Sequence, residues 1–417
     1  MNHLSRLRDH ASLQVGYCTN VHAGTDLSSI RDNLSRYAVG VRERLVQLPM
    51  SLPGNRAETA SEDHRLGVGL WIPDQASREL VEGGLDDFAN FLDRSRLSAF
   101  TINGFPFANF HGDRVKQGVY LPTWADRPRL EYTQRLATIL AHLLPSGVDL
   151  GSISTLPIGW PDNPFVEESK RKIVTADAGR HLRELAVSLE ELDRQTGKRI
   201  VVAIEPEPGC TLDTVGDMIA FFGDELPDSA HRRYITVCHD VCHSAVMNES
   251  QRDAIEAYAA AGITIGKVQV SSAIVADWKS IDREDRVAAL DQLSGFAEDR
   301  YLHQTGQVSR DGGFRLATDL PELVRESSEA SVDAADRWVI HFHIPIFLER
   351  FGHLRTTRNE VLVCLDALGD PEIDVDFTGH LEVETYAWTV LPDQMRQRGL
   401  AEDIASELEW LLTQLGE

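Results

Sequence analysis

Acidic and imidazole side chains follow several apolar runs of this 417-residue chain, each close to the point where the run ends. The side chains are those of Glu205, Glu207, Asp240, His243, Glu382 and Glu384. Apolar runs without polar alternation are typical of strands buried on both faces, and α/β proteins place their chemistry at the carboxyl ends of such strands. Oxygen and nitrogen ligands from separate segments suit a divalent cation, and paired carboxylates suit proton transfer.

Two further histidines, His341 and His343, share one face of the extended run 338–347. Two imidazoles that lie side by side inside a protein repel when protonated, and a metal, a carboxylate or water would resolve that repulsion. The alternative is one histidine satisfied in the core and one exposed. Gln269 interrupts another apolar run and must find a hydrogen-bond partner if it is buried.

Two cysteines, Cys238 and Cys242, lie in the same segment as Asp240 and His243. Thiolate and imidazole are the usual ligands of zinc. However, the spacing is not the C-x-x-C of a zinc knuckle, and singly buried cysteines usually serve packing. We therefore expect both cysteines to pack in the core rather than to bind a metal.

Eight apolar runs have the composition of buried strands. They are 14–20, which leads to His22, 66–71, 97–103, 150–156, 200–207, 234–240, 263–271 and 381–386. Amphipathic stretches separate most of them, namely 130–144, 178–195, 213–222, 252–261 and 361–368. Strand and helix alternating in this way predict an α/β fold with one closed TIM (β/α)8 barrel, although a doubly wound open sheet fits the same alternation.

Two stretches depart from the alternation. Residues 275–332 are rich in charge and short of strand signals, so we expect a helical insertion at about 275–335 after the seventh strand. Residues 104–129 form either a surface loop packed by its own aromatic side chains or a lid over the barrel mouth. These aromatics are Phe105, Phe107, Phe110, Tyr120 and Trp124. No long low-complexity linker divides the chain, so we expect residues 1–417 to form a single domain.

The charge balance argues against a nucleic-acid partner. The chain has 41 basic and 65 acidic side chains, and its net charge of −24 would repel phosphate backbones unless a local basic patch intervened. No run approaches the roughly 20 apolar residues of a membrane span. Residues 1–10 contain no apolar signal core, and the five cysteines are too few for a disulfide framework. We therefore expect a cytoplasmic protein.

The order of the strand-end residues resembles that of the xylose-isomerase-like barrel superfamily, which includes sugar isomerases, epimerases and endonuclease IV-type nucleases. The shared order is Glu after one strand, Asp-x-x-His after the next, a polar residue after the next and Glu after the last. Four motifs resemble, more closely, the EboE proteins, which are called metabolite traffic proteins after their gene cluster. The motifs are Tyr17-Cys18-Thr19-Asn20-Val21-His22, Thr101-Ile102-Asn103-Gly104-Phe105-Pro106-Phe107, His341-Phe342-His343-Ile344-Pro345 and Glu384-Thr385-Tyr386.

The resemblance implies a divalent-metal site (Mn, Mg, Zn or Fe) at the carboxyl-end face of the barrel. Its ligand positions fall on Glu205, Asp240, His243, Gln269 and Glu384, and His341 and His343 resemble extra ligands of the nuclease branch, which would allow a second ion. Gln269 stands where histidine is common, and an amide oxygen binds a cation more weakly and cannot act as a base.

Further roles follow from the same resemblance. Glu205 and Glu384 stand near the proton-transfer positions of the isomerases, so we expect them to be catalytic. The expected substrate contacts are His22, Asn103, His111, Glu207 and Glu382. His22 and His111 could equally bind metal or be structural residues of their loops.

Three functions remain open on this basis. The first is a metal-dependent enzyme that isomerises or hydrolyses a small secondary-metabolite precursor. The second is a barrel that binds a metabolite and hands it over without turnover, with other proteins of the same gene cluster as partners. The third, an endonuclease-like phosphodiesterase, is disfavoured by the negative charge. The number of acidic side chains at strand ends favours the first function over the second.

Overall fold

Eight parallel strands close into a barrel in the computed structural model, which describes residues 3–8, 10, 12–47, 65–109, 111–167, 175–327, 329–396 and 398–416. The strands are β1 (Gln14–Cys18), β2 (Leu66–Trp71), β3 (Leu97–Asn103), β4 (Leu150–Thr155), β5 (Arg199–Ile204), β6 (Ile235–Asp240), β7 (Ile265–Val270) and β14 (His380–Val383). Each strand pairs with its predecessor, and β14 closes the barrel on β1. The predicted TIM-type barrel is thereby confirmed.

Each barrel strand coincides with one of the predicted apolar runs. β2 and β3 have the predicted bounds, whereas β5 ends at Ile204, three residues before the predicted end. Pro206 and Pro208 cannot donate a ladder hydrogen bond, which is why the strand stops there. Glu205 and Glu207 therefore belong to the loop at the barrel mouth rather than to the strand itself.

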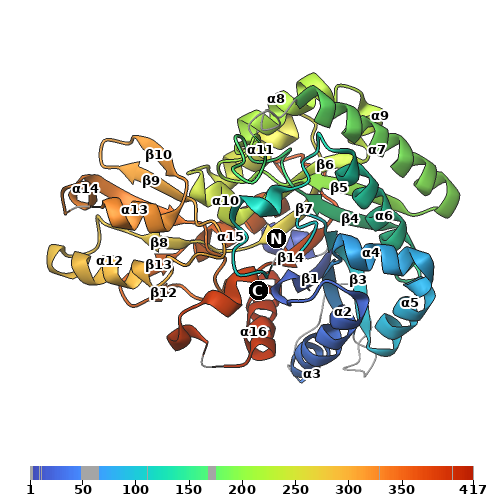
Figure 1. The fold of residues 1–417 in the computed structure, drawn as a ribbon, viewed down its shortest axis with the longest axis horizontal. Coiled ribbons are helices and arrows are strands. Elements are labelled where there is room, and N and C mark those ends of the chain that lie inside the picture. Colours follow the sequence, from blue (N-terminus) through green and yellow to red (C-terminus); the bar gives the residue numbers. More distant parts are fainter. Residues whose placement is uncertain are drawn as a thin grey trace.

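Helices cover the outside of the barrel (Figure 1). They are α2 (Leu27–Asn33), α3 (Val39–Val46), α4 (Asp74–Glu79), α5 (Leu85–Arg94), α6 (Arg127–Leu143), α7 (Thr175–Thr196), α8 (Val215–Glu225), α9 (Ser229–Arg232), α10 (Val241–Val246), α11 (Gln251–Ala260) and α15 (Arg358–Gly369). The amphipathic stretches predicted from the sequence correspond to α6, α7, α8, α11 and α15. The terminal helices α1 (His3–Arg8) and α16 (Leu400–Gly416) pack against each other. None of the helices in the described part of the chain is long and apolar enough to span a membrane.

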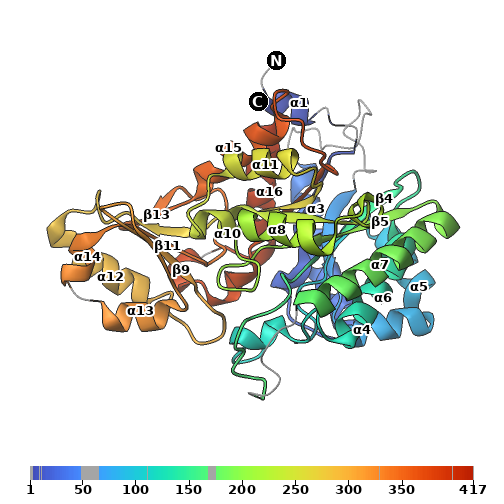
Figure 2. The same cartoon turned by 90° about the horizontal axis from the view of Figure 1, so that it is seen from above.

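The chain leaves the barrel between β7 and β14 and builds a second, antiparallel sheet, which projects to one side of the barrel in both views (Figures 1 and 2). Its strands, in spatial order, are β10 (Phe314–Ala317), β9 (Thr305–Ser309), β11 (Ala335–Ile340), β8 (Ile274–Ala276), β13 (Leu354–Thr356) and β12 (Arg350–Phe351). Three helices accompany the sheet, namely α12 (Arg286–Ser294), α13 (Leu320–Glu326) and α14 (Glu329–Ala334). The expected helical insertion is thus corrected to a mixed one that extends to Thr356.

The aromatic loop after β3 packs over the barrel mouth. Trp124 is fully buried and donates its indole N–H to Thr155 Oγ1 at 3.1 Å, and Phe107 packs edge-on against Tyr132. Tyr120 and Phe105 line a cavity at the mouth. The loop therefore combines both alternatives, since some aromatics anchor it and others cover the mouth; Phe110 lies outside the described residues.

An ion pair crosses the barrel interior below the mouth. Lys267 Nζ on β7 lies 2.6 Å from Glu382 Oε2 on β14, and neither side chain is exposed. Room for this pair comes from Gly69 on β2, because a Cβ there would lie 1.2 Å from Glu382 Oε1. Burial alone would lower the pKa of Lys267, but Glu382 raises it overall. Lys267 is therefore a permanent cation inside the barrel.

We predict that Glu407 on α16 makes stability depend on pH. Burial raises the pKa of Glu407 to about 7, and its Oε1 accepts from Thr385 Oγ1 at 2.6 Å and from Ile346 N at 3.0 Å. Because the pKa of Glu407 is higher in the folded than in the unfolded protein, the protonated carboxyl group stabilises the fold fully below its usual pKa. This contribution to stability is lost as pH rises through about 7. Glu407→Gln keeps an oxygen that can accept both hydrogen bonds but cannot lose a proton. Its free energy of unfolding should therefore fall less between pH 5 and pH 8 than that of wild type, by roughly 3 kcal/mol.

Urea unfolding of both proteins at pH 5 and at pH 8 measures this difference. Parallel pH profiles for wild type and Glu407→Gln would show that the carboxyl group does not titrate in this range.

Candidate metal centre

Three carboxylates meet at the carboxyl-end mouth of the barrel. Glu205 follows β5, Asp240 ends β6 and Glu384 follows β14, and one oxygen of each lies within 4.8 Å of the others. Backbone bonds hold the first and last in place, from Glu205 N to Thr155 O at 2.9 Å and from Glu384 N to Val270 O at 3.2 Å. All three side chains are buried. The predicted convergence of these residues on one mouth is therefore observed.

Only part of the bonding capacity of these carboxylates is used. Glu384 Oε1 accepts from Asn20 Nδ2 at 2.6 Å and from Asn103 Nδ2 at 2.8 Å. Asp240 Oδ1 accepts from Ser271 Oγ at 2.8 Å and from His243 N at 2.9 Å. Asp240 Oδ2 and Glu205 Oε2 are buried and find no hydrogen-bond partner among the described residues.

The electrostatics of the three carboxylates differ. Burial, followed by the charges of Glu384 and Asp240, raises the pKa of Glu205 well above its usual value. Burial, followed by Asp240 and Glu382, likewise raises the pKa of Glu384. Burial alone would also raise the pKa of Asp240, but His243 and His343 lower it overall. Without a compensating cation, Glu205 and Glu384 therefore retain protons to higher pH than exposed carboxyl groups.

Three histidines complete the mouth, and their hydrogen bonds fix their tautomers. The Nδ1 atoms lie 2.8 Å from Pro206 O in His243, 2.8 Å from Gln304 Oε1 in His341 and 3.0 Å from Glu384 O in His343. A carbonyl oxygen can only accept, so each Nδ1 carries the proton and donates it. In a neutral ring, the Nε2 atom is then unprotonated and carries a lone pair.

The lone pairs of His243 and His341 face each other, and the Tyr386 hydroxyl lies 3.4 Å from His341 Nε2. His243 Nε2 lies 3.2 Å from His341 Nε2 and 3.3 Å from Glu207 Oε2, and His343 Nε2 has no partner among the described residues. Burial, followed by the neighbouring histidines, lowers the pKa of His341, and burial lowers that of His343 to about 4. The rings of His341 and His343 are therefore neutral near pH 7. Metal-ligating histidines typically donate their second N–H to a carbonyl in this way.

Gln269 lies beside Asp240 in the barrel. It pairs with Asp240 on one side and with Glu382 on the other in the strand register, and its side chain is fully buried. Neither amide atom has a hydrogen-bond partner in the described part of the chain. A buried amide without partners is costly, and a cation or water within reach of its oxygen would offset that cost.

These orphaned atoms fit a divalent cation. The donor set offers carboxylate oxygens, an amide oxygen and neutral imidazole nitrogens, which are the ligand types of Mg, Mn, Fe and Zn sites. Among the described residues, the buried atoms at this mouth that lack a hydrogen-bond partner include Glu205 Oε2, Asp240 Oδ2 and Gln269 Oε1. A cation bound between the carboxylates would offset the cost of burying them.

A cavity of about 60 Å³ opens above the cluster. Its floor is polar, with Glu205, Glu207 and Glu384, and Tyr120 donates its hydroxyl to Glu207 Oε1 at 2.8 Å. Its walls are largely apolar and include Phe105, Pro106, Val115, Val119, Leu302 and Tyr386. A ligand in this cavity would present oxygen atoms to the floor and carbon to the walls.

Several predicted substrate contacts lie away from the cavity lining. Glu382 is paired with Lys267 below the mouth. His22 lies 3.1 Å from Tyr17 Oη and stacks on Tyr37. His111 Nε2 donates to Asn20 O at 2.7 Å, and Asn20 Nδ2 in turn donates to Glu384 Oε1. Asn103 and Glu207, by contrast, line the cavity as expected.

Sequence reasoning did not assign a site role to several residues at the mouth. Asn20 and Tyr386 were within the quoted motifs, which was the available signal. Another of these residues is Gln304, which directly precedes β9. Its Oε1 accepts from His341 Nδ1 at 2.8 Å, and its Nε2 donates to Pro208 O at 2.9 Å. Nothing in its local sequence marks it, because the contact depends on how the insertion folds back over the barrel.

Solved structures similar to this chain are xylose-isomerase-like barrels. A xylose isomerase-like TIM barrel protein from Mycobacterium smegmatis in complex with magnesium aligns at a TM-score of 0.50 and 11% identity, over 98% of this chain and 97% of its own. L-ribulose 3-epimerase aligns at 0.47 and 12%, over 97% and 95% of the two chains. IolI protein with a bound zinc atom aligns at 0.45 and 11%, over 97% and 98%.

Identities this low show the fold alone. The chain has the fold of the xylose-isomerase-like TIM barrels, as its sequence pattern predicted. No protein-family model and no curated protein matches the sequence.

Proposed function

We propose that this protein is an EboE-like, divalent-metal-dependent enzyme that isomerises or hydrolyses a small secondary-metabolite precursor, and that isomerisation or epimerisation by proton transfer is the reaction that its site fits best. The observation that carries the proposal is the buried cluster of Glu205, Asp240 and Glu384, in which one oxygen of each lies within 4.8 Å of the others at a cavity that Glu205 and Glu384 line. A cluster of acidic groups without a cation is costly to bury. Its presence at the carboxyl end of a barrel supports a functional rather than a structural role.

The proposed ligands are Glu205, Asp240, Gln269 and Glu384, with His243 beside them. When bound, a divalent cation polarises a carbonyl or hydroxyl oxygen of the substrate and so makes the adjacent C–H more acidic. The magnesium present in the similar Mycobacterium smegmatis barrel is in keeping with such a site.

The chain's own carboxylates would move the proton. Glu384 is held by two amide donors, from Asn20 and Asn103, whereas Glu205 Oε2 is buried without a partner and lines the cavity. A buried carboxylate oxygen that accepts no hydrogen bond is available to take a proton from a substrate carbon. We assign proton removal to Glu205 and proton return to Glu384, with Tyr120 and Glu207 orienting the substrate from the cavity floor.

The aromatic loop would exclude water during this step. Phe105 and Tyr120 from the loop and Leu302 from the insertion line the cavity with carbon, and a bound substrate packed against them would displace water from the reacting carbon.

Non-catalytic binding and hand-over remains the second candidate, with proteins of the same gene cluster as recipients. The apolar walls of the cavity favour it, since they would hold a ligand whether or not it reacts. The nuclease function is disfavoured, because the net charge of −24 opposes a phosphate backbone.

We predict that the protein labels its substrate with deuterium. In D2O, the protein supplied with Mn²⁺ and a metabolite extract should introduce one carbon-bound deuterium into a specific compound, because the proton it returns comes from solvent-exchanged Glu384 or Glu205. Mass spectrometry of the extract detects the gain. Glu205→Gln should lower the labelling rate by about 100-fold or more, since it removes the base.

Glu249→Gln is the matched control. Glu249 is a largely buried carboxyl group whose pKa burial raises to about 7, but it bonds to Val215 N outside the site. Its variant should label as fast as wild type. A compound that binds tightly and gains no deuterium would favour hand-over, and gain of oxygen from labelled water would favour hydrolysis.

A further inference from the structure

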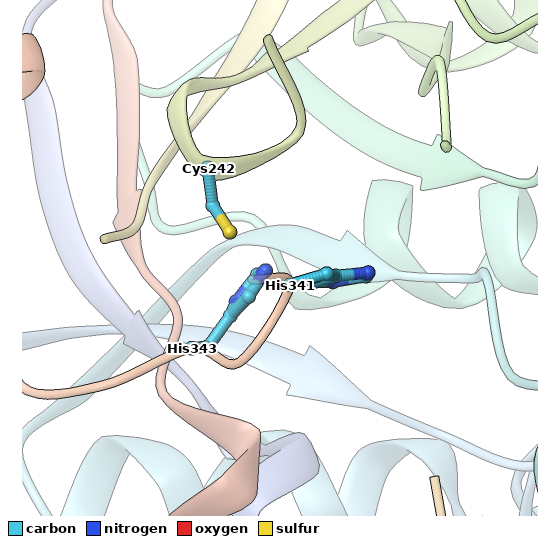
Figure 3. A group of neighbouring side chains, drawn as sticks. All are labelled: Cys242, His341 and His343. Atoms are coloured by element: carbon cyan, nitrogen blue, oxygen red, sulfur yellow. The ribbon is translucent and has the colours of Figure 1, made fainter. Parts of the chain in front are cut away.

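A thiol stands beside the two histidines of the insertion. Cys242 lies in the first turn of α10, is fully buried, and has its Sγ within 4.8 Å of a ring nitrogen of both His341 and His343. Figure 3 shows the Cys242 sulfur pointing toward the two rings, which come from a separate segment of the chain. Thiol and imidazoles thus converge from α10 on one side and from the segment after β11 on the other.

The backbone fixes the position of this thiol. Cys242 N donates to Ser271 Oγ at 2.9 Å, which fixes the start of α10. Phe342, between the two histidines, packs against Phe296 and His303. Burial, followed by the charges of Asp240 and Glu207, raises the pKa of the Cys242 thiol, so a bound cation is needed to hold it as a thiolate.

Hydrogen bonds hold the two histidine rings in position. His343 donates Nδ1–H to Glu384 O, and its buried Nε2 lacks a partner among the described residues. His341 donates Nδ1–H to Gln304 Oε1, whose amide is itself fixed by Pro208 O. Each ring therefore offers an Nε2 lone pair of fixed orientation.

We propose that Cys242, His341 and His343 form a second cation site, selective for Zn²⁺ and similar thiophilic ions and distinct from the carboxylate cluster. Sulfur and imidazole ligands suit zinc, whereas Mg²⁺ and Mn²⁺ prefer the oxygens of Glu205, Asp240 and Glu384. The mouth is thereby divided into a hard, oxygen-rich half and a soft half. His243 lies between the two halves, 3.2 Å from His341 Nε2 and 3.9 Å from Asp240 Oδ2.

Charge and protons balance in this site. On binding, the Cys242 S–H bond breaks and its proton passes to solvent, and a sulfur–zinc bond forms. The thiolate and two neutral imidazoles leave a net charge of +1 on the ion. That charge faces the acidic half of the mouth, where Asp240 and Glu207 lie near the histidines.

Cobalt reports directly on the sulfur ligand. Co²⁺ replaces Zn²⁺ in such sites and gives a near-ultraviolet sulfur-to-cobalt charge-transfer absorption that oxygen ligands do not give. Metal-free wild-type protein titrated with Co²⁺ should develop this band. Cys242→Ser should lose it, and Cys364→Ser, which changes another buried cysteine on α15, should keep it.

Two outcomes overturn the site, and the first needs no variant. Wild type that binds Co²⁺ without the charge-transfer band has no sulfur ligand, and a band that survives in Cys242→Ser comes from another cysteine. Glu384→Gln separates this site from the proposed catalytic one, because it should retain the band while it loses Mn²⁺ binding. Loss of both together would show a single site.

Discussion

Replacing Glu384 with glutamine is expected to weaken Mn²⁺ or Mg²⁺ binding by at least about 100-fold, beyond the roughly 10- to 100-fold typical of losing an outer-shell partner. A carboxylate charge supplies much of the affinity for a hard cation, and the amide removes it without changing the shape of the side chain. Calorimetric titration of metal into both proteins measures the difference.

The metal-free variant should be as stable as wild type, or more stable. Burial and the neighbouring Asp240 and Glu382 disfavour a charge on Glu384, so its removal relieves repulsion. The new amide oxygen can still accept from Asn20 and Asn103, and the amide brings no charge to a cluster whose carboxylate oxygens lie within 4.8 Å of one another. Melting temperatures measured without metal test this.

Glu249→Gln is the control here too, with wild-type affinity expected. Unchanged metal affinity in Glu384→Gln together with a large loss of metal-free stability would make Glu384 a structural residue and end its role as a ligand.

Replacing Lys267 with methionine is expected to lower the free energy of unfolding by about 3–5 kcal/mol, the range for breaking a buried ion pair on one side. Glu382 would lose the ammonium group that lies 2.6 Å from its carboxylate, and neither side chain of the pair reaches solvent. Urea unfolding of the metal-free protein gives the change.

The double variant Lys267→Met/Glu382→Leu separates charge from shape. It removes both charges, so it should recover part of the lost stability, as isosteric apolar replacements of buried pairs do. A free energy of unfolding for Lys267→Met within about 1 kcal/mol of wild type would contradict a stabilising role for the ion pair. A double variant less stable than Lys267→Met would contradict it as well.

The barrel was predictable because its strands are apolar on both faces and differ sharply from the helices between them. Residues 97–103 gave β3 without error, since the run ends in a polar Asn103 and then Gly104. The second sheet was not predictable in the same way. β8 is three residues long and β12 is two. Ile274 of β8 pairs with Thr356, 82 residues further along the chain, so no local pattern reveals the pairing.

The site was predictable where the strand register alone places a side chain. Asp240 and Gln269 are register partners, and Glu205 and Glu384 follow strands that point to the same mouth. Glu382 was placed wrongly at the mouth because its position two residues earlier sets it one layer lower, opposite Lys267. Cys242 was expected only to pack, and its approach to His341 and His343 depends on how the insertion returns to the barrel.

The central claim is that the carboxylate cluster holds a divalent cation, and anomalous X-ray diffraction from crystals soaked in Mn²⁺ tests it most directly. The account predicts a manganese peak in bonding contact with oxygens of Glu205, Asp240 and Glu384, and no such peak in Glu384→Gln crystals treated alike. A well-ordered wild-type mouth with no manganese peak at saturating concentration, or a peak only elsewhere on the protein, would contradict it.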